Sequence, residues 1–174
     1  STMKKVYIND AEFKSLTHKL CRDITNSEWR PDYIVGITRG GLIAATMISQ
    51  YFDIPLNTLQ VSLRKGETES NCWMAEDAYG YVPAESRGPS GTLTDPAYRK
   101  KILIVDDIND TGATFNWIKQ DWTTSCMSKD PTWDVIWKHN VRFAVLVNNE
   151  ASTFEGVGYS GTNINKFEDP CWIV

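Results

Sequence analysis

Apolar residues along the chain fall into short runs, separated by segments in which apolar positions recur at helical spacing. The short runs are rich in β-branched residues and predict buried strands at residues 33–37, 56–63, 101–105 and 141–147. The segments between them predict helices at residues 13–24, 42–52, 113–122 and 133–139. Apolar strands that alternate with helices indicate a mostly parallel sheet flanked by helices. We therefore predict an α/β protein with a single Rossmann-like domain.

Length and composition narrow the class of protein. At 174 residues, the chain is long enough for one domain with a substantial core. No run approaches the roughly 18 apolar residues of a membrane helix, and no basic leader precedes an apolar stretch. The net charge of −4 argues against a nucleic-acid partner. The cysteines are widely spaced, which favours thiols in a cytoplasmic protein: they are Cys21, Cys72, Cys126 and Cys171.

One long segment lacks any clear periodicity. Residues 64–99 are polar and contain several glycines and prolines. Such a length exceeds an ordinary connection in a compact domain, so it predicts a functional flap.

The chemically distinctive residues gather at the carboxyl ends of the predicted strands, where ligands of parallel sheets bind. The segment from Ile102 to Phe115 reads ILIVDDINDTGATF. A strand, a glycine turn and a helix start aim backbone N–H groups at an anion, and Thr111 and Thr114 add hydroxyl donors. No lysine follows Gly112, which excludes the usual nucleoside triphosphatase loop. A phosphate monoester fits such a loop best.

Asp106 and Asp107 would repel that phosphate, so they need another partner. Successive strand side chains point to opposite faces, so both acids serve one ligand only if the chain turns there. They would then bind hydroxyls or a metal, or balance positive charge on the ligand. A phosphorylated sugar that reacts at its anomeric carbon meets these needs.

Three different structures also place acidic residues in such a segment, but each accounts for less of it. A calcium loop fails because its twelfth position is Ile118 rather than glutamate. A receiver domain carries its acid pair after the first strand, not the third. A helix cap explains Asp110 or Thr111 alone, not the whole group.

A second loop, Thr38-Arg39-Gly40-Gly41, ends a predicted strand and precedes a helix. Close backbone packing would explain the glycines by themselves. Beside the acidic loop, however, Arg39 and the N–H groups would form a second anion site. Both loops together suit a sugar with a monophosphate at one end and a pyrophosphate at the other.

At these residues the chain resembles the type I phosphoribosyltransferases. ILIVDDINDTGAT resembles their signature for phosphoribosyl pyrophosphate (PRPP), with Asn109 polar where the family is usually apolar. GITRGGLIAA, residues 36–45, is similar to their pyrophosphate loop. The resemblance implies the type I fold, with a flap at about 64–99 and a small C-terminal hood at about 148–174.

The resemblance also implies roles for individual residues. Asp106 and Asp107 would hold the ribose hydroxyls, directly or through Mg²⁺. Asp110 would act as general acid or base near N7 of a purine. Two loops would bind the phosphates: Thr111, Gly112, Ala113 and Thr114 the 5-phosphate, and Thr38, Arg39, Gly40 and Gly41 the pyrophosphate. The peptide between Thr38 and Arg39 would be strained or cis.

The C-terminal CWIV segment is similar to the base-binding segment of bacterial xanthine-guanine and hypoxanthine enzymes. Trp172 would stack on the purine and Ile173 would read its edge; a core tryptophan is the other interpretation. A lysine that reads the 6-oxo group usually follows the strand at 141–147, where this chain has Asn149. Asparagine donates to O6 or accepts from a 6-amino group, so the choice of purine stays open.

The resemblance therefore implies a cytoplasmic, Mg²⁺-dependent purine phosphoribosyltransferase with PRPP and a free base as substrates. We expect a homo-oligomer, a dimer or tetramer. Four tryptophans in the predicted helices at 113–122 and 133–139 predict extra packing or a subunit contact: Trp117, Trp122, Trp133 and Trp137. A regulator that binds PRPP or a nucleotide without chemistry, and a transferase for adenine or a pyrimidine, are the alternatives.

Overall fold

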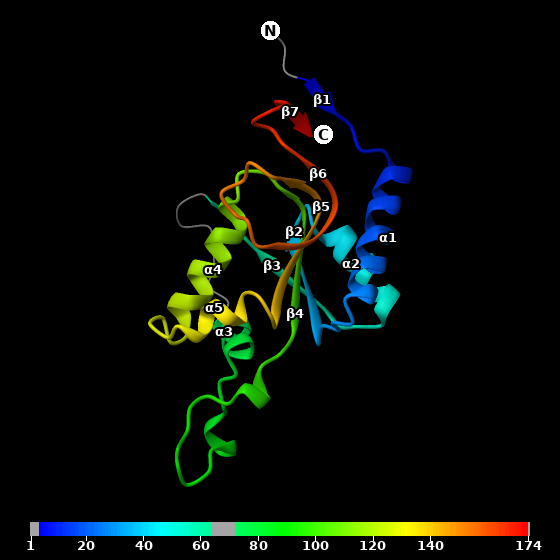
Figure 1. Cartoon of the computed structure of the whole chain (residues 1–174). Helices are drawn as coiled ribbons and strands as arrows, with labels where there is room; N and C mark the ends of the chain where they lie inside the picture. The colour runs from blue at the N-terminus through cyan, green and yellow to red at the C-terminus, as the bar shows by residue number, and fades with distance from the viewer. Residues whose placement is uncertain (1–3, 64–71, 174) are drawn as a thin grey trace.

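The computed structural model describes residues 4–63 and 72–173 (Figure 1). Arg64 and Lys65, in the first part of the expected flap, therefore lie outside the described residues. Within this part of the chain, no helix has the length and apolar character needed to cross a bilayer.

A five-stranded parallel sheet forms the centre of the molecule, in the order β3-β2-β4-β5-β6. Its strands are β2 (Tyr33–Thr38), β3 (Leu56–Gln60), β4 (Ile102–Asn109), β5 (Val141–Asn149) and β6 (Val157–Ile164). Two short strands, β1 (Lys4–Val6) and β7 (Cys171–Ile173), form a separate parallel pair. The predicted parallel sheet is confirmed.

Helices cover both faces of this sheet (Figure 1). One face carries α1 (Asp10–Asn26) and α2 (Leu42–Phe52). The other carries α3 (Cys72–Tyr79), α4 (Ala113–Ser125) and α5 (Thr132–Ile136). The first helix begins at Asp10, before the first residue of its apolar pattern, because the side chain of Asn9 caps it by accepting the N–H of Glu12 at 2.8 Å.

Alternate residues of the same strands build two cores. Ile34 and Leu103 face α1 and α2, whereas Val35 and Ile104 face α3, α4 and α5. Strand side chains alternate between faces, so a strand covered on both sides is apolar throughout. This is why the buried strands could be found from the sequence.

The tryptophans near α4 belong to the second core. Trp122, Trp133 and Trp137 are buried, and the rings of Trp133 and Trp137 stack with centroids 5.2 Å apart. Trp133 also donates its indole N–H to the carbonyl of Cys126 at 2.9 Å. The packing role predicted for these residues is confirmed.

The C-terminal region contains more of the sheet than the sequence indicated. Residues expected only as part of the hood include β6, the fifth strand of the main sheet. Its sequence, VGYSGTNI, has two glycines and several polar residues, because this edge strand is buried only at some positions. That composition conceals the strand pattern.

The expected flap is wrong for residues 72–99. Residues 72–79 form α3, whose Met74, Ala75 and Ala78 are fully buried in the core. Residues 80–99 form a loop with short 3₁₀ turns at Ala84–Ser86 and Pro96–Tyr98. This loop leads into the first residue of β4 and extends from the end of the sheet opposite β7 (Figure 1). It therefore lies away from the carboxyl ends of the strands.

Candidate active site

The predicted site residues meet at the carboxyl ends of three neighbouring strands. β2 ends at Thr38, β4 ends at Asn109, and β5 ends at Asn149. β4 lies between the other two in the sheet, so the loops after β2 and β5 flank its acidic end.

The loop between β2 and α2 packs directly against the end of β4. A Cβ atom on Gly40 would lie 2.6 Å from Asp107 Oδ2, and one on Gly41 would lie 2.7 Å from the Cα atom of Asp106. Close packing therefore does explain the two glycines. The peptide bond before Arg39 is cis, as the resemblance implies, and Arg39 is exposed. The glycines thus bring an exposed arginine loop against the acid pair.

Asp106 and Asp107 meet without the chain turn that the sequence led us to expect. β4 continues through both residues, and the N–H of Asp107 donates to Asp106 Oδ1 at 2.8 Å. Burial raises the pKa of the Asp106 carboxyl well above its usual range, and a hydrogen bond and charge repulsion from the Asp107 carboxyl raise it further. A protonated carboxyl beside a carboxylate offers both a donor and acceptors to neighbouring hydroxyls.

The loop after β4 has the form expected of a phosphate site. Gly112 has a φ of 92° and immediately precedes α4, and the N–H of Ala113 donates to Thr111 Oγ1 at 3.3 Å. Residues 106–115 line a cavity of about 230 Å³ at this point. The start of a 13-residue helix at the wall of a polar cavity favours an anion.

The connection between β5 and β6 supports the phosphate loop from behind. A Cβ atom on Gly112 would lie 2.5 Å from the backbone nitrogen of Phe154. Thr153 donates its N–H and its hydroxyl to the carbonyl of Thr111, at 3.0 and 2.7 Å. The phosphate loop is therefore held against residues about forty positions further along the chain.

The hydrogen bonds of Asn109 explain why this position is polar where the family is usually apolar. Its buried amide donates to Asn148 Oδ1 and to the carbonyl of Phe154, each at 3.0 Å, and accepts from the hydroxyl of Ser152 at 3.0 Å. The side chain thus links the end of β4 to the end of β5 and to the connection beyond it. An apolar residue could not make these links.

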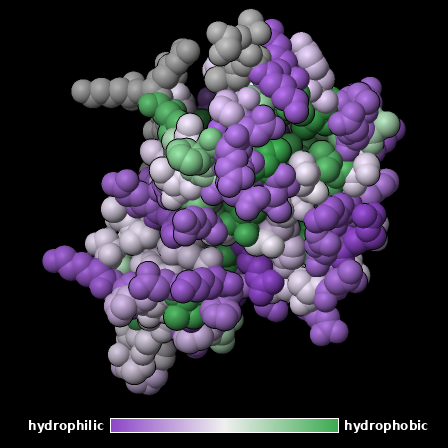
Figure 2. Space-filling model, turned by 45° about the horizontal axis from the view of Figure 1, so that its top comes forward, coloured by the Kyte–Doolittle hydropathy of each residue, from purple (hydrophilic) through white to green (hydrophobic). Residues whose placement is uncertain are grey.

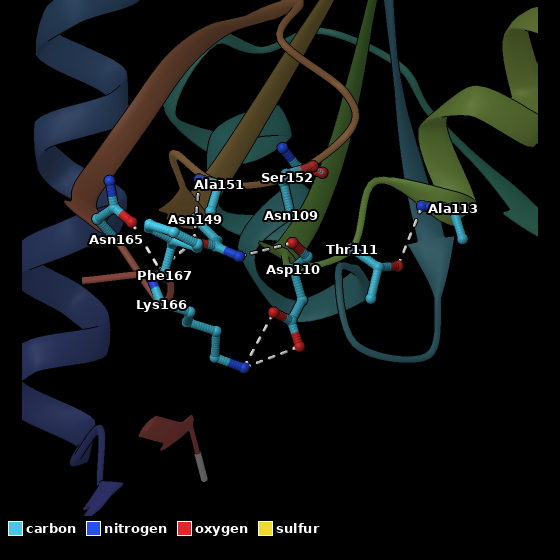
Figure 3. Close-up of polar contacts among 10 residues, drawn as sticks. All are labelled: Asn109, Asp110, Thr111, Ala113, Asn149, Ala151, Ser152, Asn165, Lys166 and Phe167. Carbon is cyan, nitrogen blue, oxygen red and sulfur yellow. Dashed lines mark hydrogen bonds and ion pairs between the residues drawn. The ribbon is translucent and has the colours of Figure 1, made fainter. Parts of the chain in front are cut away.

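The side chain of Asn149 also forms hydrogen bonds to backbone groups of the site (Figure 3). Its amide nitrogen donates to the carbonyl of Asp110 at 2.9 Å. Its oxygen accepts from the N–H groups of Ala151 and Lys166, at 3.1 and 3.0 Å. Both acceptor positions of the amide oxygen are occupied, so in this arrangement Asn149 cannot accept from a 6-amino group.

Lys166 is a site residue that the motifs in the sequence did not predict. Its ammonium group lies 2.9 Å from Asp110 Oδ1 and 3.0 Å from Oδ2 (Figure 3). The same group lies 5.7 Å from the centre of the Trp172 ring. The only signals available were the absence of a lysine near Asn149 and the presence of one shortly before Trp172.

Trp172 is not a core residue, because its side chain is 56% exposed. Ile173, next to it on β7, lines an apolar cavity of about 250 Å³ that also reaches Gly40 and Asp107. Figure 2 turns this end of the molecule toward the viewer and shows hydrophobic residues set among hydrophilic ones. The exposed ring of Trp172 suits stacking with a flat, partly apolar ligand.

Fold and site together place two candidate anion loops, an acid pair and an exposed aromatic ring at the carboxyl ends of parallel strands. The family model described as phosphoribosyl transferase domain matches residues 4–172, and the chain belongs to this family. The resemblance inferred from the two motifs is confirmed.

Two curated relatives carry related names. The chain is 33% identical over 95 residues to a xanthine-guanine phosphoribosyltransferase of Cereibacter sphaeroides, covering 54% of this chain and 48% of the relative. It is 28% identical over 114 residues to xanthine phosphoribosyltransferase 1 of Saccharomyces cerevisiae, covering 58% of this chain and 53% of the relative. The chain thus spans about half the length of the curated relatives that it matches.

Solved structures confirm the fold over nearly the whole chain. A purine phosphoribosyltransferase of Pyrococcus horikoshii superimposes with a TM-score of 0.64 at 22% identity, covering 99% of this chain and 92% of the other. A xanthine-guanine-hypoxanthine phosphoribosyltransferase of Helicobacter pylori gives 0.64 at 15% identity, covering 99% and 91%. At these identities the likeness concerns the fold alone.

Proposed function

We propose that the protein is a purine phosphoribosyltransferase. It joins a free purine to PRPP and releases a nucleoside 5′-monophosphate and pyrophosphate. The observation that carries this proposal is the contact between the 38–41 loop and Asp107, with the 110–114 loop beginning at the end of the same strand. Two candidate anion sites therefore flank one acid pair, as a sugar phosphorylated at both ends requires.

Each loop has a role at one end of the sugar. Arg39 and the N–H of Gly40 bind the pyrophosphate and stabilise its charge as it leaves, whereas the N–H of Gly41 already donates to the carbonyl of Ile37 at 2.9 Å. Residues 111–114 bind the 5-phosphate at the start of α4. Between them, Asp106 and Asp107 hold the ribose hydroxyls and stabilise the positive charge that develops at the anomeric carbon.

The base occupies the side of the site formed by β7 and Asp110. Trp172 offers its exposed ring for stacking, and the backbone at Ile173 reads the edge of the base. Asp110 takes or returns the proton at N7 as N9 forms its bond to the sugar. The names of the curated relatives favour a 6-oxopurine as this base.

The acid pair fits a magnesium ion. Among residues 4–63 and 72–173, no three histidine, cysteine or acidic side chains form a metal cage. Mg²⁺ is commonly held by one or two carboxylates together with substrate oxygens and water, and Asp106 and Asp107 supply such carboxylates. When bound, the ion would neutralise negative charge on the leaving pyrophosphate.

Two further statements belong to the proposal. We place the enzyme in the cytoplasm, where the buried thiols of Cys21, Cys126 and Cys171 would stay reduced. We also expect it to assemble as a dimer or tetramer, without a nucleic-acid partner.

Product formation tests the proposed function directly. Purified protein is supplied with Mg²⁺, PRPP and one of four bases: hypoxanthine, guanine, xanthine or adenine. We expect nucleoside monophosphate and pyrophosphate to form in equal amounts with at least one 6-oxopurine. No turnover of any base would overturn the proposal, and saturable PRPP binding in that case would identify a regulator on the same fold.

A further inference from the structure

Lys166 connects the two halves of the base site. It lies in the turn between β6 and β7, and its backbone N–H is held by Asn149 at 3.0 Å. Its side chain is 18% exposed and reaches Asp110, a residue 56 positions away in the chain. Its ammonium group also lies near the face of the Trp172 ring. The side chain is thus fixed at its base and directed into the site.

We propose that Lys166 selects a 6-oxopurine over a 6-aminopurine, and that its ion pair with Asp110 is the resting form of a base-recognition pair. This inference rests on the proposed function. It assigns the reading of the 6-position to the turn between β6 and β7, not to Asn149 at the end of β5.

The chemistry of the two groups supports this assignment. An ammonium group only donates hydrogen bonds, and a carboxylate only accepts them. Side by side, Lys166 and Asp110 therefore present a donor next to an acceptor. The edge of a 6-oxopurine with a proton on N7 presents the complementary order, because O6 accepts and N7–H donates. A 6-amino group would instead place a donor against Lys166.

The geometry provides the position as well as the chemistry. The Lys166 ammonium lies over the face of the Trp172 ring, 5.7 Å from its centre, so a base that stacks on this face meets the ion pair of Lys166 and Asp110 directly. On entry, the base replaces the ion pair by two hydrogen bonds, one from Lys166 to O6 and one from N7–H to Asp110. Both charged groups therefore keep a hydrogen-bond partner when the base enters, which limits the free-energy cost of breaking the ion pair.

Asn149 offers O6 at most one neutral donor, which is weaker than the ammonium of Lys166. Its amide oxygen already accepts two backbone N–H groups, and its nitrogen already donates to the carbonyl of Asp110. We assign it a positioning role, because it fixes both the Asp110 backbone and the turn that carries Lys166.

The test compares Lys166→Met with Lys4→Met. Methionine keeps the length of the side chain and removes the ammonium group. Lys4 is a matched control, because it lies on β1 next to β7 but forms only an exposed ion pair with Asp169. Calorimetry measures the binding of inosine and adenosine monophosphates to each protein, and steady-state kinetics measures turnover of hypoxanthine and adenine.

We expect Lys166→Met to weaken inosine monophosphate about tenfold or more, since hydrogen bonds to charged groups contribute this much. Adenosine monophosphate should change by less than about threefold. The preference for hypoxanthine over adenine should fall, while the KM for PRPP and the melting temperature stay close to those of Lys4→Met. Lys166→Arg, which keeps a cationic donor, should retain part of the preference.

The outcomes separate the two proposals. A folded Lys166→Met that keeps the wild-type preference for inosine monophosphate would overturn the role of Lys166 alone. Binding of inosine monophosphate that depends on Lys166, without turnover of any base, would overturn the proposed function and uphold the role of Lys166. A wild-type protein that binds neither nucleotide would overturn both.

Discussion

The two anion loops of the site are built in different ways. The 38–41 loop reaches its place because two glycines lack side chains and approach β4 closely. The 110–114 loop also contains a closely packed glycine, Gly112, but side chains hold it as well, including the buried amides of Asn109 and Asn149. The first loop depends on close backbone packing, whereas the second adds a network of side-chain hydrogen bonds, so the two should respond differently to substitution.

The largest effect should come from Gly40→Ala. The new methyl group would lie 2.6 Å from Asp107 Oδ2. A carboxylate at the end of a side chain can move aside, so folding should change little, but the acid pair and the loop would both be displaced. We expect kcat/KM for PRPP to fall by about 10²-fold or more, because displacements of this size cost that much. Kinetics and thermal melting together measure this.

Gly88 provides the control for that substitution. It lies in the 80–99 loop, and a Cβ atom added there has nothing within 4 Å. Gly88→Ala should leave both activity and melting temperature unchanged. If Gly40→Ala were equally silent, the contact between the 38–41 loop and Asp107 would have no part in catalysis.

Asp110→Asn should have the next largest effect. An amide cannot take a proton from N7, so turnover should fall by an order of magnitude or more while PRPP still binds. Kinetics at saturating PRPP, with equilibrium binding of PRPP, separates these two quantities. Asp169→Asn, which removes an exposed carboxylate near β7, is the control and should behave as wild type. Wild-type turnover by Asp110→Asn would contradict its role as acid or base.

The contrast between the loops also shows how far the sequence could predict the site. The 38–41 and 110–114 motifs are local, so the order of residues in the chain was enough to find Asp106, Asp107 and the flanking loops. Lys166 lies 56 residues beyond Asp110, and only the path of β6 and the following turn brings the two together. A local sequence pattern does not indicate that two residues so far apart in the chain lie next to each other in space.

The fold shows the same limit. Strands buried on both faces were found because most of their residues are apolar, as in the first four residues of β4. The edge strand β6 was missed because glycines and polar residues interrupt it. The helix α3 was missed because it is short and two acidic residues, Glu76 and Asp77, interrupt its buried residues. Periodicity identifies elements with long apolar runs, and it fails where polar residues or glycines interrupt a short element.

A smaller effect on activity is expected from Asn109→Leu, which restores the usual apolar residue. Leucine would leave Asn148 Oδ1 and the carbonyl of Phe154 without the hydrogen bonds that Asn109 donates. We expect the free energy of unfolding to fall by about 1–3 kcal/mol, and the KM for PRPP to rise several-fold as the phosphate loop loosens. Urea unfolding and steady-state kinetics measure the two effects.

Asn163→Leu controls for the change of side chain. Asn163 is exposed on β6, and its substitution should alter the free energy of unfolding by less than about 0.5 kcal/mol. Equal stability of Asn109→Leu and wild type would show that the amide network does not support the phosphate loop.

The last prediction concerns the dependence of stability on pH and comes from Asp106→Asn. Burial, together with Asp107, raises the pKa of the Asp106 carboxyl from 3.8 to about 8. Between these values the folded protein keeps a proton that the unfolded chain has lost, so the free energy of unfolding falls as pH rises through this range. Asparagine does not titrate, and the variant should be more stable than wild type at pH 8.5 by about 1–3 kcal/mol.

Urea unfolding of both proteins at pH 5.5, 7 and 8.5 measures this difference. Groups away from the acid pair titrate equally in both proteins, so the change of the difference with pH reports on Asp106 together with its neighbour Asp107. The gain in stability should grow with pH and should accompany a loss of turnover, because the same carboxyl serves the ribose. A difference that stays constant from pH 5.5 to 8.5 would contradict the raised pKa. A difference that grows would show that the acid pair, unlike the amide network behind the phosphate loop, is kept for function at the expense of stability.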